Sequence, residues 1–349
     1  MENIAALMET HLDNLTKPKG SLGKLEEYCM KMALIQGKVP PQIGKKGVYV
    51  FAGDHGVSAE GVSLYPDEVT RQMVLNILAG GAGVNALASG TGWEVTMIDG
   101  GVKGFFPEQS GASTPGSCRF INAKIREGTR NILKENAMTG EEFKKSIEWG
   151  ERLALDAHTQ GYDLVAIGDL GIGNTTTAAA MLTAAGFPAD IVTDRGTGIT
   201  AEMLENKKKV VEDAVALRAP EKKGEAILEK LGSFEFAMMA GMVLKLADYS
   251  IGCVIDGFPV SAAVYMAFLI NPKISNYLFA GHLSKVIGHK PLLDTMGLDP
   301  ILSLDMRLGE GTGALIGGYI VELATITARK MASFAEAGVS ESGTQEENY

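Results

Sequence analysis

The chain has 349 residues, of which 46% are hydrophobic and 21% are charged, and its formal net charge is −10. These proportions are typical of a globular protein with a large core, and they exclude an intrinsically disordered chain. The acidic charge argues against binding to nucleic acid or to an anionic membrane surface, because both attract basic proteins.

The cysteines and the apolar residues are distributed as in a cytoplasmic protein. The three cysteines are scattered and form no CxxC pair, which argues against a disulfide framework and against a zinc site. Charged residues run through positions 1–15, unlike in a signal peptide. The most apolar stretch, residues 254–270, is interrupted by Asp256, Gly257 and Pro259, so we expect no membrane span.

We expect the chain to fold in four parts. The N-terminal segment has a helical pattern as far as Gly37, broken by a turn at residues 17–21. The parts are an N-terminal helical part of a small lobe (residues 1–40), an α/β core domain (41–290), a C-terminal part with a candidate catalytic loop and a helix (291–335), and a flexible acidic tail (336–349).

Five short apolar runs, each followed by glycine and a polar residue, predict buried strands. They are residues 48–52, 95–98, 164–167, 253–255 and 277–280. Helical segments alternate with them, which is typical of βαβ units with parallel strands. Right-handed crossovers bring the C-terminal ends of such strands to one edge of the sheet, where open α/β proteins bind their ligands. We therefore expect an α/β fold with a doubly wound, mainly parallel, Rossmann-like sheet and a smaller helical lobe from the chain termini.

The segment after the third of these strands has the composition of an anion site. Gly171 and Gly173 form a turn, and Asn174 and Thr175 follow it at the start of an alanine-rich helix. Free backbone N–H groups and the positive end of the helix dipole would both face a bound phosphate. The same pattern also fits an ordinary strand-to-helix turn with Asn or Thr as the N-cap.

A dinucleotide-binding fingerprint is the alternative interpretation of this turn. Gly171 and Gly173 match the first two glycines of GxGxxG, and Asp194 lies about twenty residues further on. Thr176 replaces the third glycine, however, and no Walker lysine follows. The pattern therefore favours the phosphate of a mononucleotide.

Two features of the following segment carry charge. The turn of residues 194–198 contains Arg195 and Gly196, which either add a cation and N–H donors at the same edge or lie on the surface. The run from Lys207 to Lys209 lies in a helical stretch of mixed charge, and this pattern predicts a solvent-exposed face.

The last glycine-rich turn, residues 307–313, places Glu310 between Gly309 and Gly311 in front of an apolar helix. One interpretation is a carboxylate that complements the dipole of that helix. The other is a general base that a rigid turn aims at a substrate. The residues alone leave both open.

The candidate metal ligands do not form a site in the sequence. His55 follows the first predicted strand, and His282 and His289 are seven residues apart. Neither helical i,i+4 spacing nor a carboxylate cluster accompanies them. We expect no metal and no cofactor, and we expect these histidines to stabilise turns or to face a dimer partner.

Six motifs, in order along the chain, identify a family. They are residues 17–26 (KPKGSLGKLE), 51–57 (FAGDHGV), 61–73 (GVSLYPDEVTRQM), 171–176 (GIGNTT), 195–198 (RGTG) and 307–313 (RLGEGTG). Together they resemble the nicotinate-nucleotide:dimethylbenzimidazole phosphoribosyltransferases, which make the lower-ligand nucleotide of cobalamin. The resemblance extends from about residue 15 to about residue 328.

This resemblance implies an enzyme, a homodimer, and site residues at matching positions. Nicotinate mononucleotide and 5,6-dimethylbenzimidazole would give α-ribazole 5′-phosphate and nicotinate. The implied catalytic residues are Glu310 and Asp169. The implied phosphoribosyl-binding residues are Gly171, Gly173, Asn174, Thr175, Arg195, Gly196, Lys207 and Gly309. The implied base-binding residues are Tyr65, Gln72, Leu170 and Leu308.

The chain departs from the family at one point. The family usually has Glu-Met before the Gly-Ile-Gly-Asn turn, and this chain has Asp169 and Leu170. A carboxylate that is one methylene shorter keeps open the same chemistry with another benzimidazole, adenine or a phenol. A non-catalytic nucleotide-binding protein and a nicotinamide-dependent dehydrogenase are the alternatives from other classes.

Overall fold

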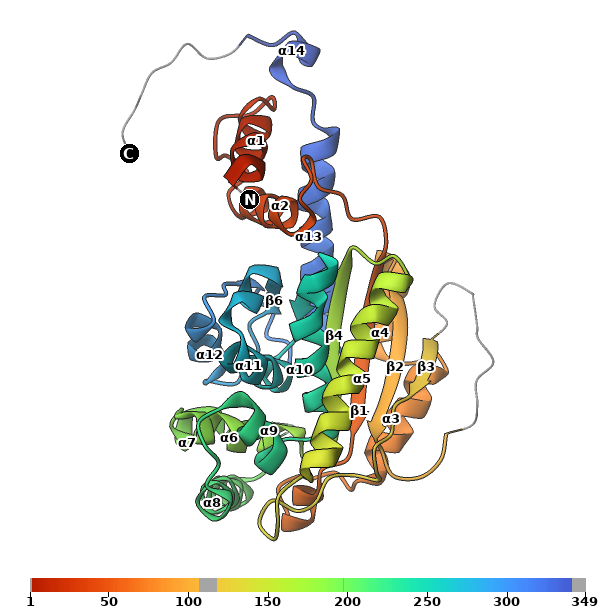
Figure 1. Cartoon of the computed structure of the whole chain (residues 1–349), viewed down its shortest axis with the longest axis vertical. Helices are drawn as coiled ribbons and strands as arrows, with labels where there is room; N and C mark the ends of the chain where they lie inside the picture. The colour runs from red at the N-terminus through yellow and green to blue at the C-terminus, as the bar shows by residue number, and fades with distance from the viewer. Residues whose placement is uncertain (1, 107–117, 197, 341–349) are drawn as a thin grey trace. The chain divides into compact units, whose positions relative to one another are not determined.

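The structure is a computed structural model that describes residues 2–106, 118–196 and 198–340 (Figure 1). It divides into two compact units. The larger unit is Lys45–Gly318, and the smaller unit combines the described residues on either side of that range. The tail expected at residues 336–349 lies outside the described residues from position 341 onward.

The larger unit contains a parallel sheet in which seven strands are described, in the order β3-β2-β1-β4-β5-β6-β7. The strands are β1 Lys46–Gly53, β2 Glu94–Gly101, β3 Cys118–Asn122, β4 Leu164–Leu170, β5 Gly252–Ile255, β6 Leu278–His282 and β7 Pro300–Leu302. The order reverses between β1 and β4, so the C-terminal ends of these two strands flank the switch point at which open α/β sheets bind ligands. The predicted doubly wound, parallel fold is confirmed.

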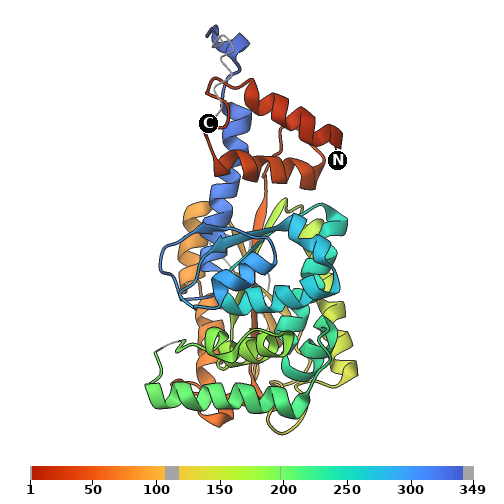
Figure 2. The same cartoon turned by 90° about the vertical axis from the view of Figure 1, so that its left-hand side faces the viewer.

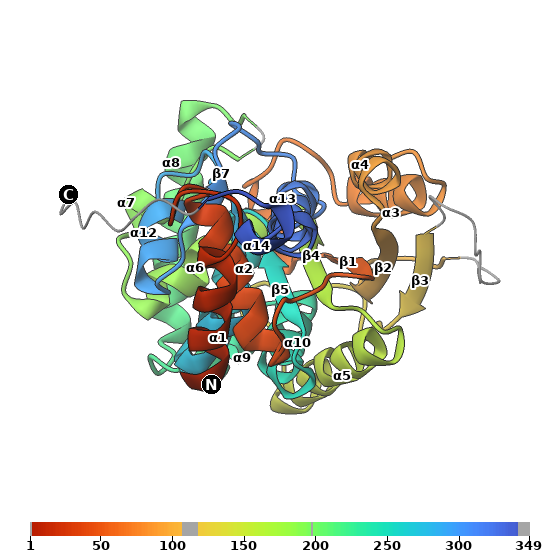
Figure 3. The same cartoon turned by 90° about the horizontal axis from the view of Figure 1, so that it is seen from above.

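Helices cover both faces of this sheet. Helices α3 (Glu68–Leu78) and α4 (Gly83–Thr91) lie on one face, and α5 (Gly140–Thr159) and α10 (Phe234–Leu246) lie on the other (Figure 3). Helices α5 and α10 approach each other closely because a Cβ atom at Gly150 would lie 2.1 Å from the carbonyl oxygen of Met238. With both faces covered, β1 is buried along its whole length, as expected for a central parallel strand.

The remaining helices of the larger unit follow β4, β5 and β6. They are α6 Asn174–Ala185, α7 Ala189–Val192, α8 Ala201–Arg218, α9 Gly224–Leu231, α11 Phe258–Ile270 and α12 His289–Thr295, with 3₁₀ turns at Gly56–Glu60, Ala247–Tyr249 and Pro272–Tyr277. Helices α6 and α8 pack against each other (Figure 2). Helix α13 (Thr312–Lys330) begins in the larger unit and ends in the smaller one.

The smaller unit is helical and has its own apolar core. Its helices are α1 (Glu2–Asp13), α2 (Lys24–Gln36), the C-terminal part of α13, and α14 (Phe334–Ala337). The core consists of Met8, Leu12, Leu15, Cys29, Ala33, Ala324 and Ala328. The first sequence motif lies in this unit, where the buried ammonium group of Lys17 pairs with Glu26 at 2.8 Å. This pair links the turn at residues 17–21 to α2.

One apolar segment, residues 68–91, is long enough to cross a membrane and contains an 18-residue window with a mean hydropathy of 1.3. The structure divides it into α3 and α4, which are 11 and 9 residues long and are separated by Gly80 and Gly81. Each helix alone is shorter than the roughly 20 residues that a span requires. Both helices instead cover one face of the sheet.

Candidate active site

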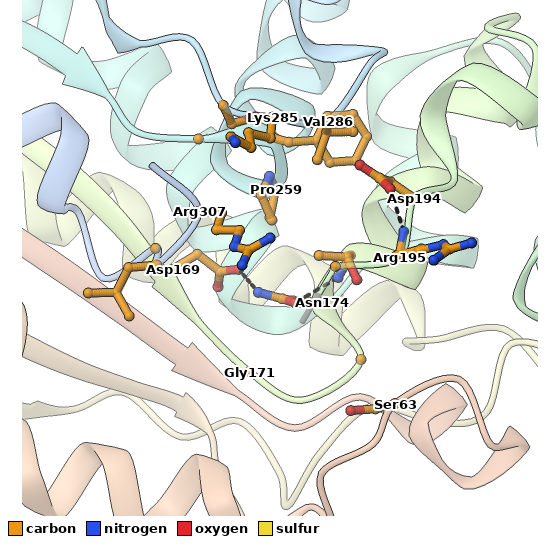
Figure 4. A pocket seen from close by; sticks show the side chains of 18 of the residues that line it. Ser63, Asp169, Gly171, Asn174, Asp194, Arg195, Pro259, Lys285, Val286 and Arg307 are labelled. Atoms are coloured by element: carbon orange, nitrogen blue, oxygen red, sulfur yellow. Dashed lines mark hydrogen bonds between the residues drawn. The ribbon is translucent and has the colours of Figure 1, made fainter. Parts of the chain in front are cut away.

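A cavity of about 580 Å³ lies at the C-terminal ends of β4, β5 and β6. Its described lining comes from five parts of the chain, namely residues 169–175, residues 194–196 with 198–199, residues 256–260, residue 282 with 284–286, and residues 307–309. Val62 and Ser63 from the loop after β1 and Lys207 from α8 complete it. Asp169, Asn174 and Arg307 all point into it (Figure 4). The three glycine-rich turns of the sequence therefore meet at one site.

The turn after β4 presents a helix N-terminus to the cavity. Gly173 has a left-handed φ of 96°, which glycine adopts without strain, and α6 begins at the next residue. Asn174 accepts the backbone N–H of Thr175 on its Oδ1 at 2.7 Å. A Cβ atom at Gly171 would lie only 2.3 Å from the carbonyl oxygen of Gly53, so the turn can pass β1 only without a side chain. The result is a small, polar turn that an anion can approach closely.

Lys207 supplies a buried cation beside this turn. Its ammonium group donates to Oγ1 of Thr175 at 2.8 Å and to the carbonyl oxygen of Asp194 at 3.0 Å. The residue is 2% exposed, and burial lowers the pKa of Lys207 to about 8. The pattern-based prediction of a solvent-exposed lysine face is therefore wrong for Lys207, although Lys209 is exposed. The ammonium group thus lies beside a hydroxyl group at the N-terminus of α6, where a bound anion would be close to it.

The second glycine turn borders the same end of the cavity. Gly196 lies beside Thr175 and Lys207, since a Cβ atom placed on it would be 3.6 Å from Oγ1 of Thr175. Arg195 is exposed, and its backbone N–H donates to Oδ1 of Asp194 at 2.5 Å (Figure 4). Position 197 of this motif lies outside the described residues.

Asp169 places a carboxylate in the wall of the cavity. It is the penultimate residue of β4, and its Oδ2 accepts a hydrogen bond from the side-chain amide of Asn174 at 2.6 Å. Its Oδ1 is buried and has no hydrogen-bond partner. Burial, together with the negative charge of Glu235, raises the pKa of Asp169 to about 7. This carboxyl group can therefore gain or lose a proton near neutral pH.

Glu310 lies beside Asp169, but its carboxylate faces another element. Its backbone is left-handed, with φ at 63°, and its N–H donates to the carbonyl oxygen of Asp169 at 3.2 Å. Oε2 accepts the backbone N–H of Val84, at the start of α4, across 3.4 Å. Leu308 and Gly309 line the cavity, whereas Glu310 itself does not. Burial raises the pKa of the Glu310 carboxyl, which favours a group that can exchange protons.

Asp256, rather than Glu310, complements the start of α13. Its carboxylate accepts three backbone N–H groups, from Gly311 at 3.1 Å, Gly313 at 2.9 Å and Ala314 at 3.0 Å. The dipole of α13 thus already has a partner, and the carboxylate of Glu310 lies instead at the start of α4. The sequence places Asp256 after a predicted strand, at the ligand-binding edge of the sheet, but indicates no role for it.

The base-binding residues divide into two groups. Leu170 and Leu308 line the cavity, whereas Tyr65 and Gln72 are exposed and are not among its described lining residues. Apolar side chains that sequence reasoning missed form part of the wall, namely Phe258, Pro259, Val260 and Val286. They follow β5 and β6 directly, and the sequence signal for them was their position after predicted strands.

The three histidines are buried and bonded to other side chains. His282 lines the cavity, with its Nε2 at 3.4 Å from Oδ1 of Asp256. His289 accepts the backbone N–H of Ser284 on Nδ1 at 3.0 Å, and its Nε2 lies 2.9 Å from Oγ of Ser261. Burial lowers the pKa of His289 to about 3, so this ring is neutral. Within the described ranges, no three His, Cys, Asp or Glu side chains group as ligands for a metal ion.

Comparisons with known proteins point to one activity. A phosphoribosyltransferase family model matches residues 1–339. The nicotinate-nucleotide–dimethylbenzimidazole phosphoribosyltransferase of Geobacter sulfurreducens is 45% identical over 340 residues, which cover 97% of this chain and 94% of that protein. The enzyme of the same name from Thermus thermophilus is 42% identical over 338 residues, which cover 97% of this chain and 98% of that protein. The crystal structure of CobT from Thermus thermophilus superposes with a TM-score of 0.91 at 42% identity, over 97% of this chain and 100% of that one.

Proposed function

The chain belongs to the family of the nicotinate-nucleotide–dimethylbenzimidazole phosphoribosyltransferases, and we propose that Asp169 and Glu310 carry out its reaction beside the cavity at the ends of β4, β5 and β6. The enzyme transfers the phosphoribosyl group of nicotinate mononucleotide to 5,6-dimethylbenzimidazole. The products are α-ribazole 5′-phosphate, the lower-ligand nucleotide of cobalamin, and nicotinate. The observation that supports the assignment of residues is that Lys207, the start of α6 and Asp169 line one cavity, while the backbone N–H of Glu310 donates to the carbonyl oxygen of Asp169.

The phosphate of nicotinate mononucleotide binds at the start of α6. There it meets the positive end of the helix dipole and the Thr175 hydroxyl group. The ammonium group of Lys207 already lies against Thr175, so it adds a positive charge without a rearrangement. Gly196 leaves room for the phosphate oxygens on the other side. Arg195 contributes a second cation at the rim.

Asp169 stabilises the charge that develops on the ribose. The bond from the anomeric carbon to the pyridinium nitrogen breaks, and its electron pair leaves with nicotinate as a neutral pyridine ring. Positive charge then builds up on the ribose, as in an oxocarbenium ion. A nearby carboxylate in a site of low dielectric constant favours this charge. Oδ1 of Asp169 is buried and has no hydrogen-bond partner, so the carboxylate acts on the ribose through its negative charge rather than through a direct contact.

Glu310 is the general base for the incoming benzimidazole. One ring nitrogen attacks the anomeric carbon on the face opposite the leaving group, which converts the β configuration into α. The other nitrogen must lose its proton, and a carboxylate accepts it. For this step, Glu310 leaves the N–H of Val84, whose 3.4 Å separation is long for a hydrogen bond. The apolar wall around Leu308 and Phe258 suits an aromatic base.

The shorter carboxylate at position 169 favours the use of other acceptors in addition to 5,6-dimethylbenzimidazole. Asn174 holds Oδ2 of Asp169 and Oδ1 is buried, so the shorter carboxylate does not present a free oxygen to an incoming base. An acceptor of another shape, such as another benzimidazole, adenine or a phenol, is then accepted by the same chemistry. A protein that only binds nucleotides would have no need of a buried Glu310 next to Asp169.

We further propose that the enzyme is a cytoplasmic homodimer that binds neither nucleic acid nor membranes. The three buried, free cysteines support a cytoplasmic location. The net charge of −10 argues against binding to nucleic acid or to anionic membranes. Leu304 and Leu308 expose 55% and 61% of their surface next to the site, which supports cover by a second copy. Light scattering on the eluted protein tests the dimer.

The function is tested by incubating the protein with nicotinate mononucleotide and a panel of bases. We expect mass spectrometry to detect α-ribazole 5′-phosphate and free nicotinate in equal amounts, with 5,6-dimethylbenzimidazole or a related base as the acceptor. Proton NMR of the product should show the α configuration. Binding of nicotinate mononucleotide without any product from the panel would overturn the assignment as an enzyme of this class.

A further inference from the structure

A buried ion pair lies directly beneath the glycine turn of the site, and the reaction described above does not use it. His55, the second residue after β1, has its Nε2 at 3.1 Å from Oε1 of Glu235, near the start of α10. Both side chains are completely buried. Ser233 also donates a hydrogen bond to this carboxylate. Such a pair usually stabilises a fold less than apolar side chains of similar volume would, so its position calls for a reason.

The pair is in close contact with the turn that carries the site. A Cβ atom at Gly171 would lie 2.9 Å from Nε2 of His55, and one at Gly173 would lie 3.1 Å from the Cβ of His55. Nδ1 of His55 lies 2.9 Å from Oγ1 of Thr177, in the first turn of α6. The imidazole ring is thus held between the turn on one side and Glu235 on the other. A change in the charge or position of this ring therefore changes the electrostatic environment and the packing of residues 169–174.

Few other charges surround Asp169. His55 follows β1 and Glu235 lies on α10, while α6 contributes the neutral amide of Asn174. The segment before α13 contributes the backbone N–H of Glu310. Around His55 itself, Asp54 and Asp169 are the acids besides Glu235, and Asp67 lies further out. Asp256, His282, Lys285 and Arg307 line other parts of the same cavity.

We propose that His55 and Glu235 are positioning residues, which support the turn of residues 171–173 and set the charge that Asp169 carries during the transfer. The proposal rests on the role of Asp169 in the proposed function. In a site of low dielectric constant, the imidazolium of His55 favours the ionised form of Asp169, and the carboxylate of Glu235 favours the protonated form. Because the two charges have opposite effects, the intact pair leaves the pKa of Asp169 near neutral pH.

The two members of the pair therefore have opposite, measurable effects. We expect the acid limb of the kcat/KM profile to report the protonation of Asp169, because only the ionised form stabilises the ribose charge. His55→Gln leaves Glu235 without its counter-ion, so the limb should move to higher pH by about one unit. The double variant His55→Gln/Glu235→Gln removes both charges, so the limb should return to the wild-type pH or below it.

A merely structural role gives a different result. A purely structural role predicts that the double variant loses at least as much activity as the single variant. It also predicts that the acid limb stays at the wild-type pH in both. Thr177→Val is the matched control, because it removes the contact to Nδ1 of His55 and keeps both charges. We expect this variant to lower the rate with an unmoved limb. In an Asp169→Asn background, His55→Gln should no longer move the limb, which distinguishes Asp169 from Glu310 as the group that titrates.

An unmoved limb in His55→Gln, or a double variant whose limb stays with that of the single variant, would overturn the proposal. If His55→Gln does not fold, Glu235→Gln carries the test: the proposal expects its limb at lower pH, and a limb that is unchanged or higher overturns it. Wild-type protein that forms no product contradicts the proposed function instead, so the two failures are distinguishable.

Discussion

The backbone N–H of Glu310 donates to the backbone carbonyl oxygen of Asp169 at 3.2 Å, which joins the two proposed catalytic residues directly. One belongs to β4 and the other to a turn that is about 140 positions later in the sequence. The approach is possible because the strand carries Gly168 next to the turn. A Cβ atom at that position would lie 2.2 Å from the backbone nitrogen of Gly311. The spacing of the two carboxyl groups thus depends on a missing side chain.

Gly168→Ala should therefore separate the two residues. We expect kcat to fall by about 10²-fold, since a displacement of about 1 Å at a reacting group has an effect of this size. Binding of nicotinate mononucleotide should change less, because the start of α6 is not displaced. Gly90→Ala in α4 is the control: a Cβ atom there meets nothing within 4 Å, so activity should be unaffected. Similar activity of the two variants would show that the contact does not set the geometry.

Lys207→Met should weaken the binding of nicotinate mononucleotide. The substitution keeps the buried stem and removes the charge, and a charge-assisted hydrogen bond to phosphate contributes enough for a roughly 10- to 100-fold rise in KM. The pKa of Lys207, about 8, predicts that wild-type affinity also falls as the pH rises above 8, when the ammonium group deprotonates.

The exposed Lys209 provides the control for this prediction. Lys209→Met should leave KM unchanged at low salt, and KM should depend less on salt in Lys207→Met than in the wild-type enzyme. Steady-state rates at two salt concentrations give KM for each variant. Calorimetric titration of nicotinate mononucleotide under the same conditions gives the corresponding binding affinities. Equal affinity in Lys207→Met and the wild type would remove this residue from the phosphate site.

Asp169→Glu should shift the choice of base toward 5,6-dimethylbenzimidazole. The longer side chain extends the carboxylate by about 1.5 Å toward the cavity, which restores a direct hydrogen bond to the N–H of a benzimidazole. Competition between two bases in one reaction gives the ratio of products without separate rate measurements. Identical product ratios in Asp169→Glu and the wild type would mean that position 169 does not determine the preference.

His289 should make the fold sensitive to acid. Its folded-state pKa of about 3 lies below the ordinary value of 6.5, so the unfolded chain binds the additional proton between these values. The contribution of His289 to the free energy of unfolding is then fully present above pH 6.5 and is lost as the pH falls toward 3. The loss reaches about 3 kcal/mol near pH 4. His289→Gln should be less stable at pH 7, and this difference should narrow at pH 4.5. Urea unfolding at both pH values measures it, and a constant difference would contradict the prediction.

The central strands of the sheet were predictable from sequence, and the edge strands were not. Central parallel strands are buried on both faces, so they form uninterrupted apolar runs such as residues 164–167. The edge strand β3 contains Arg119 and Asn122 and is only partly buried. The other edge strand, β7, has three residues and begins with Pro300. Neither strand has an apolar run that distinguishes it from a loop.

The candidate site was predictable where one short segment forms it. The turn at Gly171 and Gly173 combines strand, turn and helix within a few residues, so its composition predicted the strand-to-helix turn that the structure shows, with an anion site as one interpretation. Lys207 reaches the same place from a separate helix, and a local charge pattern predicted the opposite environment for it. The roles of Asp256 and of the His55–Glu235 pair depend on contacts between segments far apart in the sequence, which no local pattern encodes.

The central claim is that Glu310 is the base of the transfer, and Glu310→Gln tests it most directly. The amide keeps the size of the side chain and cannot accept the benzimidazole proton. Single-turnover formation of α-ribazole 5′-phosphate should therefore slow by about 10²- to 10⁴-fold. Calorimetry on the same preparation should give an unchanged affinity for nicotinate mononucleotide, because the phosphate site is intact. A variant that retains most of the wild-type rate would contradict the account.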